Sequence, residues 1–289
     1  MLLKAEYVFQ PRRLVRRLLV RPRHDATALV EARLPWGRSI RVSPRDNIGP
    51  AVLTLGVYDL VVTETLWRLT ESDDIAVDIG ANIGCITAAL AERAGEVHCF
   101  EPHPLLHAEL LENIRLLESQ GVAARIVAQR CALGGSTGTL PLRVPADFAR
   151  HRGESTLVDS ASAAEVVQVQ VRTLDDVFGD RSIGVMKMDV EGFEAQVLRG
   201  AARLLSDRRL RDCVFEEHRP YPTEVSRIFE SHGYTIFRLA RRLMRPKLLP
   251  ADSTEPRSHW EATSFLATRD AVRAQARMTG IGWMCLGWS

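Results

Sequence analysis

One turn between a predicted strand and a predicted helix restricts the fold of this chain more than any other feature. The segment 77–84 reads VDIGANIG, and it closes an apolar strand and opens a helix. Glycine lets the backbone pass close to a ligand, and the unpaired N–H groups at a helix N-terminus attract an anion. In this context a glycine-rich turn indicates a nucleotide-type cofactor.

The spacing within this turn separates two kinds of cofactor. Dinucleotide-binding turns follow the pattern G-x-G-x-x-G. Here Gly80 and Gly84 are separated by only three residues, Asn82 takes the middle place, and an acid, Asp78, precedes the turn. A dinucleotide therefore fits this turn less well than another nucleoside cofactor does.

Strands and helices alternate along most of the chain. Apolar, β-branched runs followed by stretches of helical spacing are typical of βαβ units and a parallel sheet. The pattern predicts strands at 75–79, 96–101, 125–129, 185–189, 213–217, 234–239 and 264–268, and helices at 57–69, from 84, and at 104–120, 193–205 and 223–232. The sequence thus predicts an α/β fold.

Three segments depart from this alternation. Residues 28–42 are predicted to form a hairpin around the turn at 35–37. Residues 134–180, with strands at 140–144 and 166–171, are predicted to form a mid-chain strand and loop insertion on the sheet. The Arg- and Pro-rich residues 241–262 are predicted to be a connection.

The charge and cysteine content favour a globular protein of a reducing compartment. The 38 basic and 36 acidic residues nearly balance, which argues against a nucleic-acid partner bound through bulk charge. No apolar run reaches the roughly 18 residues of a membrane span. The five cysteines are scattered without metal or redox spacing, so we expect a cytoplasmic location.

The N-terminal residues carry a basic, amphipathic stretch. Between Pro11 and Pro22, four leucines and valines share one helical face, opposite several arginines that also break any signal-peptide pattern. We expect a short helix that packs on the domain with a solvated basic side. Peripheral contact with an anionic membrane is the less favoured alternative.

A second motif supports the nucleoside cofactor. Glu101 ends the next predicted strand, about twenty residues after the glycine turn, where an acid is placed to accept both ribose hydroxyls. Alone, Glu101 would be interpreted as a cap of the following helix. Together with the glycine turn, it favours ribose binding.

Six motifs in this order resemble the FkbM family of S-adenosylmethionine-dependent methyltransferases. They are GVYD at 56–59, VDIGANIG at 77–84, FEPHP at 100–104, CALG at 131–134, TLDD at 173–176 and KMDVEGFE at 187–194. The resemblance covers about residues 48–268. It implies a seven-stranded, Rossmann-like class I methyltransferase fold and methyl transfer to a hydroxyl of a natural product, sugar or glycan. Some relatives methylate amide nitrogen.

The resemblance also implies the cofactor site. Asp78, Gly80, Asn82 and Gly84 would hold the methionine end of S-adenosyl-L-methionine, and Glu101 its ribose. Cys131 and Ala132 would line the adenine, although both are nearly as well explained as core and turn residues.

Acidic residues follow the fourth and fifth predicted strands, at the sheet edge where ligands bind. Asp189 ends one strand and Glu191 lies just beyond it, while Glu217 ends the next strand and His218 follows it. A base is needed if a hydroxyl proton is to leave during methyl transfer, and these are the candidates. Alternatively, Glu191 caps a helix and Asp189 orients Lys187. A Mg²⁺ site from Asp189, Glu217 and His218 is less favoured than a metal-free site.

We therefore expect a cytoplasmic O-methyltransferase with a small-molecule or glycan acceptor, as a monomer or homodimer. The alternatives are N-methylation, a nicotinamide-dependent oxidoreductase, and a cofactor-binding protein without turnover. We expect an extension at 1–47, the methyltransferase domain at 48–268 and a tail at 269–289. Trp283 and Trp288 in that tail suggest docking, preferably onto its own domain.

Overall fold

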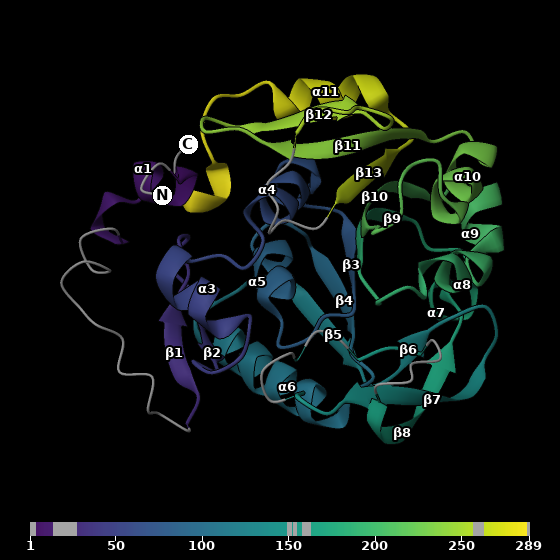
Figure 1. Ribbon diagram of the computed structural model, residues 1–289, viewed down its shortest axis with the longest axis horizontal. Coiled ribbons are helices and arrows are strands. Elements are labelled where there is room, and N and C mark those ends of the chain that lie inside the picture. Colours follow the sequence, from purple (N-terminus) through teal and green to yellow (C-terminus); the bar gives the residue numbers. More distant parts are fainter. Residues whose placement is uncertain are drawn as a thin grey trace.

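A single eight-stranded sheet forms the centre of the protein (Figure 1). The computed structural model describes residues 4–13, 28–148, 152, 155–157, 163–256 and 263–287. From one edge to the other, the strands are β12 (Pro246–Pro250), β11 (Thr235–Arg241), β13 (Ser264–Thr268), β10 (Leu210–Glu216), β9 (Ile183–Met188), β3 (Ile75–Ile79), β4 (Glu96–Phe100) and β5 (Arg125–Gln129).

The strand order confirms the Rossmann-like α/β fold. Strands β5, β4, β3, β9 and β10 are parallel neighbours, which is the Rossmann order 3-2-1-4-5. Strand β13 runs antiparallel to both β10 and β11. The segment 241–262, expected to be a connection, instead contains β12, which pairs with β11 and makes the sheet eight-stranded rather than seven-stranded.

Helices cover both faces of the sheet, and neighbouring strand residues divide between them. Ala76 packs with α4 (Leu60–Leu69), α5 (Cys85–Ala91) and α11 (Ala271–Met278). The next residue, Val77, packs with the opposite layer, which comprises α7 (Leu174–Phe178), α8 (Glu194–Arg199), α9 (Ala202–Ser206) and α10 (Glu224–Ser231). Burial on both faces explains the continuous apolar strands in the sequence.

The predicted N-terminal hairpin is confirmed. Strands β1 (Val30–Arg33) and β2 (Ser39–Val42) pair around the turn and lie beside α6 (Pro104–Ser119). Asn113 of α6 accepts from the N–H of Arg41 at 2.7 Å and donates to the carbonyl of Ile83 at 2.8 Å. One side chain therefore connects the hairpin, α6 and the glycine turn. Helix α3 (Gly49–Leu55) follows the hairpin.

The mid-chain insertion forms a small sheet of its own, with the order β6-β8-β7. Its strands are β6 (Ala132–Leu133), β7 (Gly138–Pro145) and β8 (Ala163–Arg172), and the last two extend beyond the predicted strands. They lie at the bottom of the molecule in Figure 1.

The predicted helix at 193–205 is wrong in one respect, because the structure divides it into α8 and α9 near Gly200. A Cβ atom on Gly200 would lie 2.0 Å from the carbonyl oxygen of Gly134. This backbone contact excludes any side chain and coincides with the break. The predicted basic helix between Pro11 and Pro22 lies largely outside the described residues.

The C-terminal segment packs on the chain's own fold, as preferred from the sequence. Trp283, just before the short helix η1 (Met284–Leu286), is fully buried and donates to the carbonyl of Leu243 at 3.0 Å. The carboxylate of Glu64 in α4 accepts from the N–H groups of Met284 and Cys285, both at 2.8 Å. Trp288 lies outside the described residues. Within the described part of the chain, no helix has the length and apolar character of a membrane span.

Candidate active site

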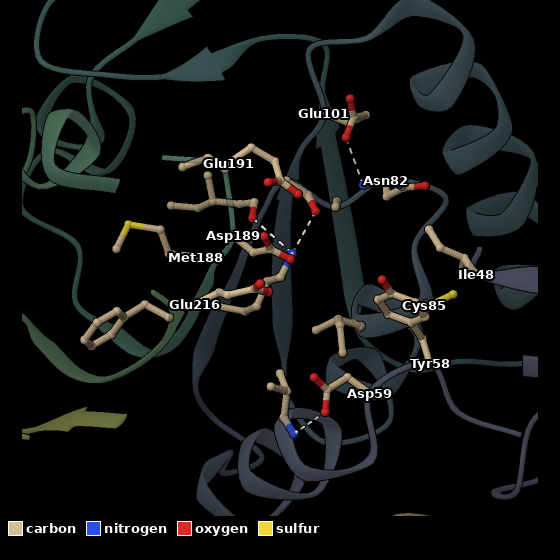
Figure 2. Close-up of a pocket in the computed structure, with 18 of the residues that line it drawn as sticks. Ile48, Tyr58, Asp59, Asn82, Cys85, Glu101, Met188, Asp189, Glu191 and Glu216 are labelled. Atoms are coloured by element: carbon tan, nitrogen blue, oxygen red, sulfur yellow. Dashed lines mark hydrogen bonds and ion pairs between the residues drawn. The ribbon is translucent and has the colours of Figure 1, made fainter. Parts of the chain in front are cut away.

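A cavity of about 750 Å³ opens at the carboxyl ends of β3, β4, β9 and β10. This size is typical of small-molecule and cofactor sites. Figure 2 shows Glu101 and Asn82 at one end, Tyr58 and Asp59 at the other, and acidic side chains between them. The middle group consists of Asp189, Glu191 and Glu216.

The glycine turn passes directly beside the end of β9. Gly80 has a φ of 73°, and a Cβ atom there would lie 2.0 Å from the carbonyl oxygen of Asp189. Asn82 also has a positive φ, 52°, which asparagine tolerates better than most residues. The turn therefore keeps a tight backbone path, and Gly80 and Asn82 both line the cavity.

Glu101 is buried at the tip of β4, and both of its oxygens are hydrogen-bonded. One accepts from the N–H of Asn82 at 2.9 Å and the other from the N–H of His103 at 2.8 Å. Burial raises the pKa of Glu101 to about 7, although these two hydrogen bonds oppose the rise. The contact with His103 is the helix-capping role considered above. Each carboxylate oxygen retains lone-pair capacity for a ligand.

Two residues expected at the methionine end do not line the cavity. Asp78 is fully buried behind the turn, where it accepts from the Thr87 hydroxyl at 2.6 Å. Burial raises the pKa of Asp78 in spite of the nearby Lys187 ammonium. Gly84 precedes α5, and a Cβ atom there would lie 2.7 Å from the Leu110 side chain. Gly84 therefore serves helix packing.

Cys131 and Ala132 are both buried, and both line the cavity between β5 and the small sheet. Both residues thus border the cavity, as the expected contact with an adenine requires. Their second interpretation, as core residues, also holds, because Cys131 packs with the α7–α10 layer.

Asp189 and Glu191 both line the cavity, directly after β9. The Asp189 carboxylate lies 3.4 Å from the Lys187 ammonium. In the turn before α8 (Glu194–Arg199), the Glu194 carboxylate accepts from the N–H groups of Val190 at 3.2 Å and Gly192 at 3.3 Å.

At the end of β10, Glu216 lines the cavity and the expected Glu217 does not. Glu217 is buried away from the cavity, and its carboxylate binds Arg219 at 3.0 and 3.1 Å. Glu216 lines the cavity in its place. Successive residues of a strand point to opposite sides, so a choice that is wrong by one residue selects the wrong face.

Glu216 lies in a strongly acidic environment. Burial, followed by the charges of Asp189, Glu191 and Asp59, raises its pKa to about 8. His218 also lines the cavity, 3.3 Å from Glu216, but its side chain is 66% exposed. His218 therefore lies at the solvent-facing side.

Tyr58 and Asp59 line the cavity as well, although neither was expected there. Asp59 caps α4 by accepting from the N–H of Val62 at 3.1 Å, and both residues line the cavity. Burial and the charges of Asp189 and Asp59 raise the pKa of Tyr58. The GVYD motif at 56–59 was the available signal.

A further part of the cavity wall, formed by the N-terminal residues, was also not predicted. Helix α1 (Ala5–Phe9) places Glu6 at the cavity, where its buried carboxylate pairs with Arg241 at the end of β11. No motif in the sequence indicated that residues so early in the chain reach the site.

The described residues contain no group of three or more histidine, cysteine or acidic side chains arranged to hold a metal ion. The sequence alternative of a Mg²⁺ site also required Glu217, which faces away from the cavity.

Residues 78–236 match the model of the methyltransferase FkbM domain. This match spans more than half of the chain, including the glycine turn and the tips of β4, β9 and β10. The chain belongs to the FkbM methyltransferase family. Membership in the FkbM family makes the protein a methyltransferase and removes the nicotinamide-dependent oxidoreductase considered above.

Three methyltransferases illustrate the relationship. Methyltransferase sdnD of Sordaria araneosa is 25% identical over 217 residues, which cover 63% of this chain and 82% of the relative. The 31-O-demethyl-FK506 methyltransferase FkbM of Streptomyces tacrolimicus is 27% identical over 196 residues, which cover 56% of this chain and 73% of the relative. The hexuronic acid methyltransferase AglP of Haloferax volcanii is 26% identical over 152 residues, which cover 50% of this chain and 56% of the relative.

Among solved structures, the FkbM methyltransferase of Methylobacillus flagellatus KT is 20% identical, with a TM-score of 0.43. The alignment covers 67% of this chain and 43% of that protein. A likeness this weak supports no conclusion beyond those drawn from the sheet topology and the family.

Proposed function

We propose that this protein transfers a methyl group from S-adenosylmethionine to a hydroxyl oxygen of a small-molecule or glycan acceptor. One observation carries the proposal: the glycine turn and Glu101 share a single cavity with Asp189 and Glu216. A nucleoside-binding end and an acidic end thus meet in one space, as an in-line transfer between two bound molecules requires.

The residues at the first end fit the cofactor. The Glu101 carboxylate is placed to accept ribose hydroxyls, and charged hydrogen bonds of this kind contribute about 1.5–3 kcal/mol each. The backbone of Gly80–Asn82 would border the methionine part, and Cys131 and Ala132 the adenine. When bound, S-adenosylmethionine supplies a methyl group on a positively charged sulfur.

The acidic residues would handle the acceptor. We assign Asp189 to receive the hydroxyl proton, which leaves as the oxygen–carbon bond forms. Glu216, with its pKa raised to about 8, is protonated near neutral pH. It would therefore donate a hydrogen bond to a polar group beside the reacting hydroxyl. We assign Glu191 to the acceptor end as well, and we assign no chemical step to His218.

The far wall of the cavity would recognise the rest of the acceptor. Tyr58 and Asp59 border this end, together with the Glu6–Arg241 ion pair. One relative is a 31-O-demethyl-FK506 methyltransferase, and this supports oxygen as the acceptor atom here.

We extend the proposal to the organisation and location of the protein. Residues 48–268 would form the methyltransferase domain, and α1 of the extension at 1–47 would complete the acceptor site. All five cysteines are free thiols, which supports a reducing, cytoplasmic compartment.

Labelled methyl transfer tests the proposal. The protein is incubated with S-adenosylmethionine carrying a ¹³C methyl group and a panel of paired acceptors, each with a hydroxyl or an amine at the same position. We expect ¹³C NMR of the products to show a methyl ether. A product methylated on nitrogen would overturn the assignment of oxygen.

A further inference from the structure

A buried lysine connects the cofactor-binding turn to the acidic residue of the proposed reaction. Lys187, on β9, is 7% exposed. Its ammonium donates to the carbonyl of Gly80 at 2.8 Å and to that of Ile79 at 3.3 Å. The same ammonium lies 3.4 Å from the Asp189 carboxylate and 3.7 Å from that of Asp78.

The charges around Lys187 come from three neighbouring strands. Asp78 lies on β3, Asp189 follows β9, and Glu216 ends β10. Burial alone would lower the pKa of Lys187, but the charges of Asp189, Asp78 and Glu216 hold it above its ordinary value. Lys187 therefore remains a cation, and its charge opposes the rise in the pKa of both Asp78 and Glu216.

This arrangement leaves Lys187 unsuited to chemistry of its own. Its protons are directed to two backbone carbonyls, and a charged ammonium has no lone pair with which to accept a proton. Asp78 does not line the cavity, and its carboxylate lies 3.7 Å from the Lys187 ammonium.

We propose that Lys187 is a positioning residue that fixes the glycine turn and the Asp189 carboxylate in one arrangement, so that cofactor and acceptor are aligned. This inference rests on the proposed function. It implies that loss of the ammonium changes both ends of the cavity, the backbone at Gly80 and the titration of Glu216.

Two measurements on Lys187→Met test the inference. The first is calorimetric titration with S-adenosylhomocysteine, for which we expect affinity to fall about tenfold or more. The second is ¹³C NMR titration of protein labelled at the glutamate carboxyl carbons, with the Glu216 signal assigned by its absence in Glu216→Gln. Because the Lys187 charge lowers the pKa of Glu216, we expect this signal to titrate at higher pH in the variant.

A matched control separates positioning from general stability. Arg68→Met also removes a buried cation, one that pairs with Glu64 at 2.6 Å in α4, outside the cavity lining. It should lower the melting temperature but leave ligand affinity and the Glu216 titration unchanged. If Lys187→Met fails to fold, Asp78→Asn with Lys187→Met removes the ammonium together with the carboxylate buried 3.7 Å from it, and the same two shifts are expected.

The outcomes are distinct. Wild-type affinity together with an unshifted Glu216 signal in a folded Lys187 variant would overturn the inference alone. If the wild-type protein itself does not bind S-adenosylhomocysteine, the proposed function fails, and the inference fails with it.

Discussion

The carboxylate of Glu101 accepts a hydrogen bond from the backbone N–H of Asn82 at 2.9 Å. This bond connects the tip of β4 to the glycine turn after β3. The two motifs that indicated a nucleoside cofactor in the sequence are therefore one hydrogen-bonded unit in the structure. The unit also explains why a positive φ at Asn82 is maintained: it directs the N–H at Glu101.

Cofactor affinity should depend on the protonation of Glu101. Its pKa is raised to about 7, so the carboxyl group gains a proton as the pH falls below that value and loses acceptor capacity for the ribose hydroxyls. We expect the affinity for S-adenosylhomocysteine to fall below pH 7, by up to about tenfold per pH unit. In Glu101→Gln, calorimetry should show weaker binding without this pH dependence. A wild-type affinity that is constant from pH 5 to 8 would contradict the assignment.

Asp189→Asn should spare cofactor binding and slow methyl transfer. The amide retains the size of the carboxylate but cannot receive the proton, so kcat should fall by about 10²–10⁴-fold. Transfer of a labelled methyl group at saturating cofactor measures this, once the acceptor panel has produced a substrate. Turnover at the wild-type rate would remove Asp189 from the chemistry.

Glu216→Gln should remove a decline in activity at alkaline pH. In the wild-type protein, Glu216 loses its proton near pH 8, and with it the proposed hydrogen bond to the acceptor. We expect kcat/KM to fall above pH 8 in the wild type but not in Glu216→Gln, whose amide still donates. A wild-type rate that instead rises through pH 8 would indicate that Glu216, not Asp189, is the base.

Glu216 and Glu217 should have opposite effects on stability. The raised pKa of Glu216 means that the folded state holds its proton more tightly than the unfolded state, so stability is lost as pH rises from about 4.5 to 8. At pH 8.5, Glu216→Gln should raise the melting temperature, by about 2–4 °C per kcal/mol. Arg219 and backbone hydrogen bonds outweigh the burial of Glu217 and lower its pKa, so Glu217→Gln should lower the melting temperature at that pH. If scanning calorimetry shows melting temperatures that change in the same direction in both variants, it would contradict the placement of Glu216 at the cavity and of Glu217 on the opposite face.

The buried pair beneath the C-terminal segment should contribute substantially to stability. Glu64 and Arg68 are both almost fully buried, and Glu64 also holds the N–H groups of Met284 and Cys285. Glu64→Gln should lower the free energy of unfolding by about 3–5 kcal/mol in urea titrations. The exposed pair of Arg199 with Glu224 is the control. Its loss in Arg199→Gln should lower the free energy of unfolding by less than about 1 kcal/mol. Equal losses in the two variants would show that the buried pair has no special role.

Much of the fold follows from local patterns that the sequence displays directly. The strands at 75–79, 125–129 and 264–268 were predicted with the boundaries that the structure has, because each is a short apolar run bounded by polar or turn residues. The break between α8 and α9 was not predictable, since it coincides with a contact of Gly200 with Gly134, far away in the sequence. Likewise, β12 exists through its pairing with β11 and not through its own composition.

In the candidate site, too, some residues could be predicted from local patterns and others depend on distant packing. Glu101, Asp189 and Gly80 were expected to lie together, and they line one cavity because their motifs stand at strand ends, where topology determines the location. The exchange of Glu217 for Glu216 depends on which face each residue presents, and two adjacent glutamates give no sequence signal for that choice. Glu6 reaches the cavity only through the packing of α1, which no motif predicts. The boundaries proposed at residues 47 and 268 stay predictions.

Calorimetric titration of the full-length chain with S-adenosylmethionine, in parallel for the wild type and Glu101→Ala, tests the central claim most directly. The account predicts binding of one equivalent to the wild type and a loss of about 1.5–3 kcal/mol in the variant, at least tenfold in affinity. Gly135→Ala, outside the cavity lining, serves as a folded control with wild-type affinity. Absence of binding to the wild type, or an affinity of folded Glu101→Ala equal to that of the wild type, would contradict the proposed cofactor site.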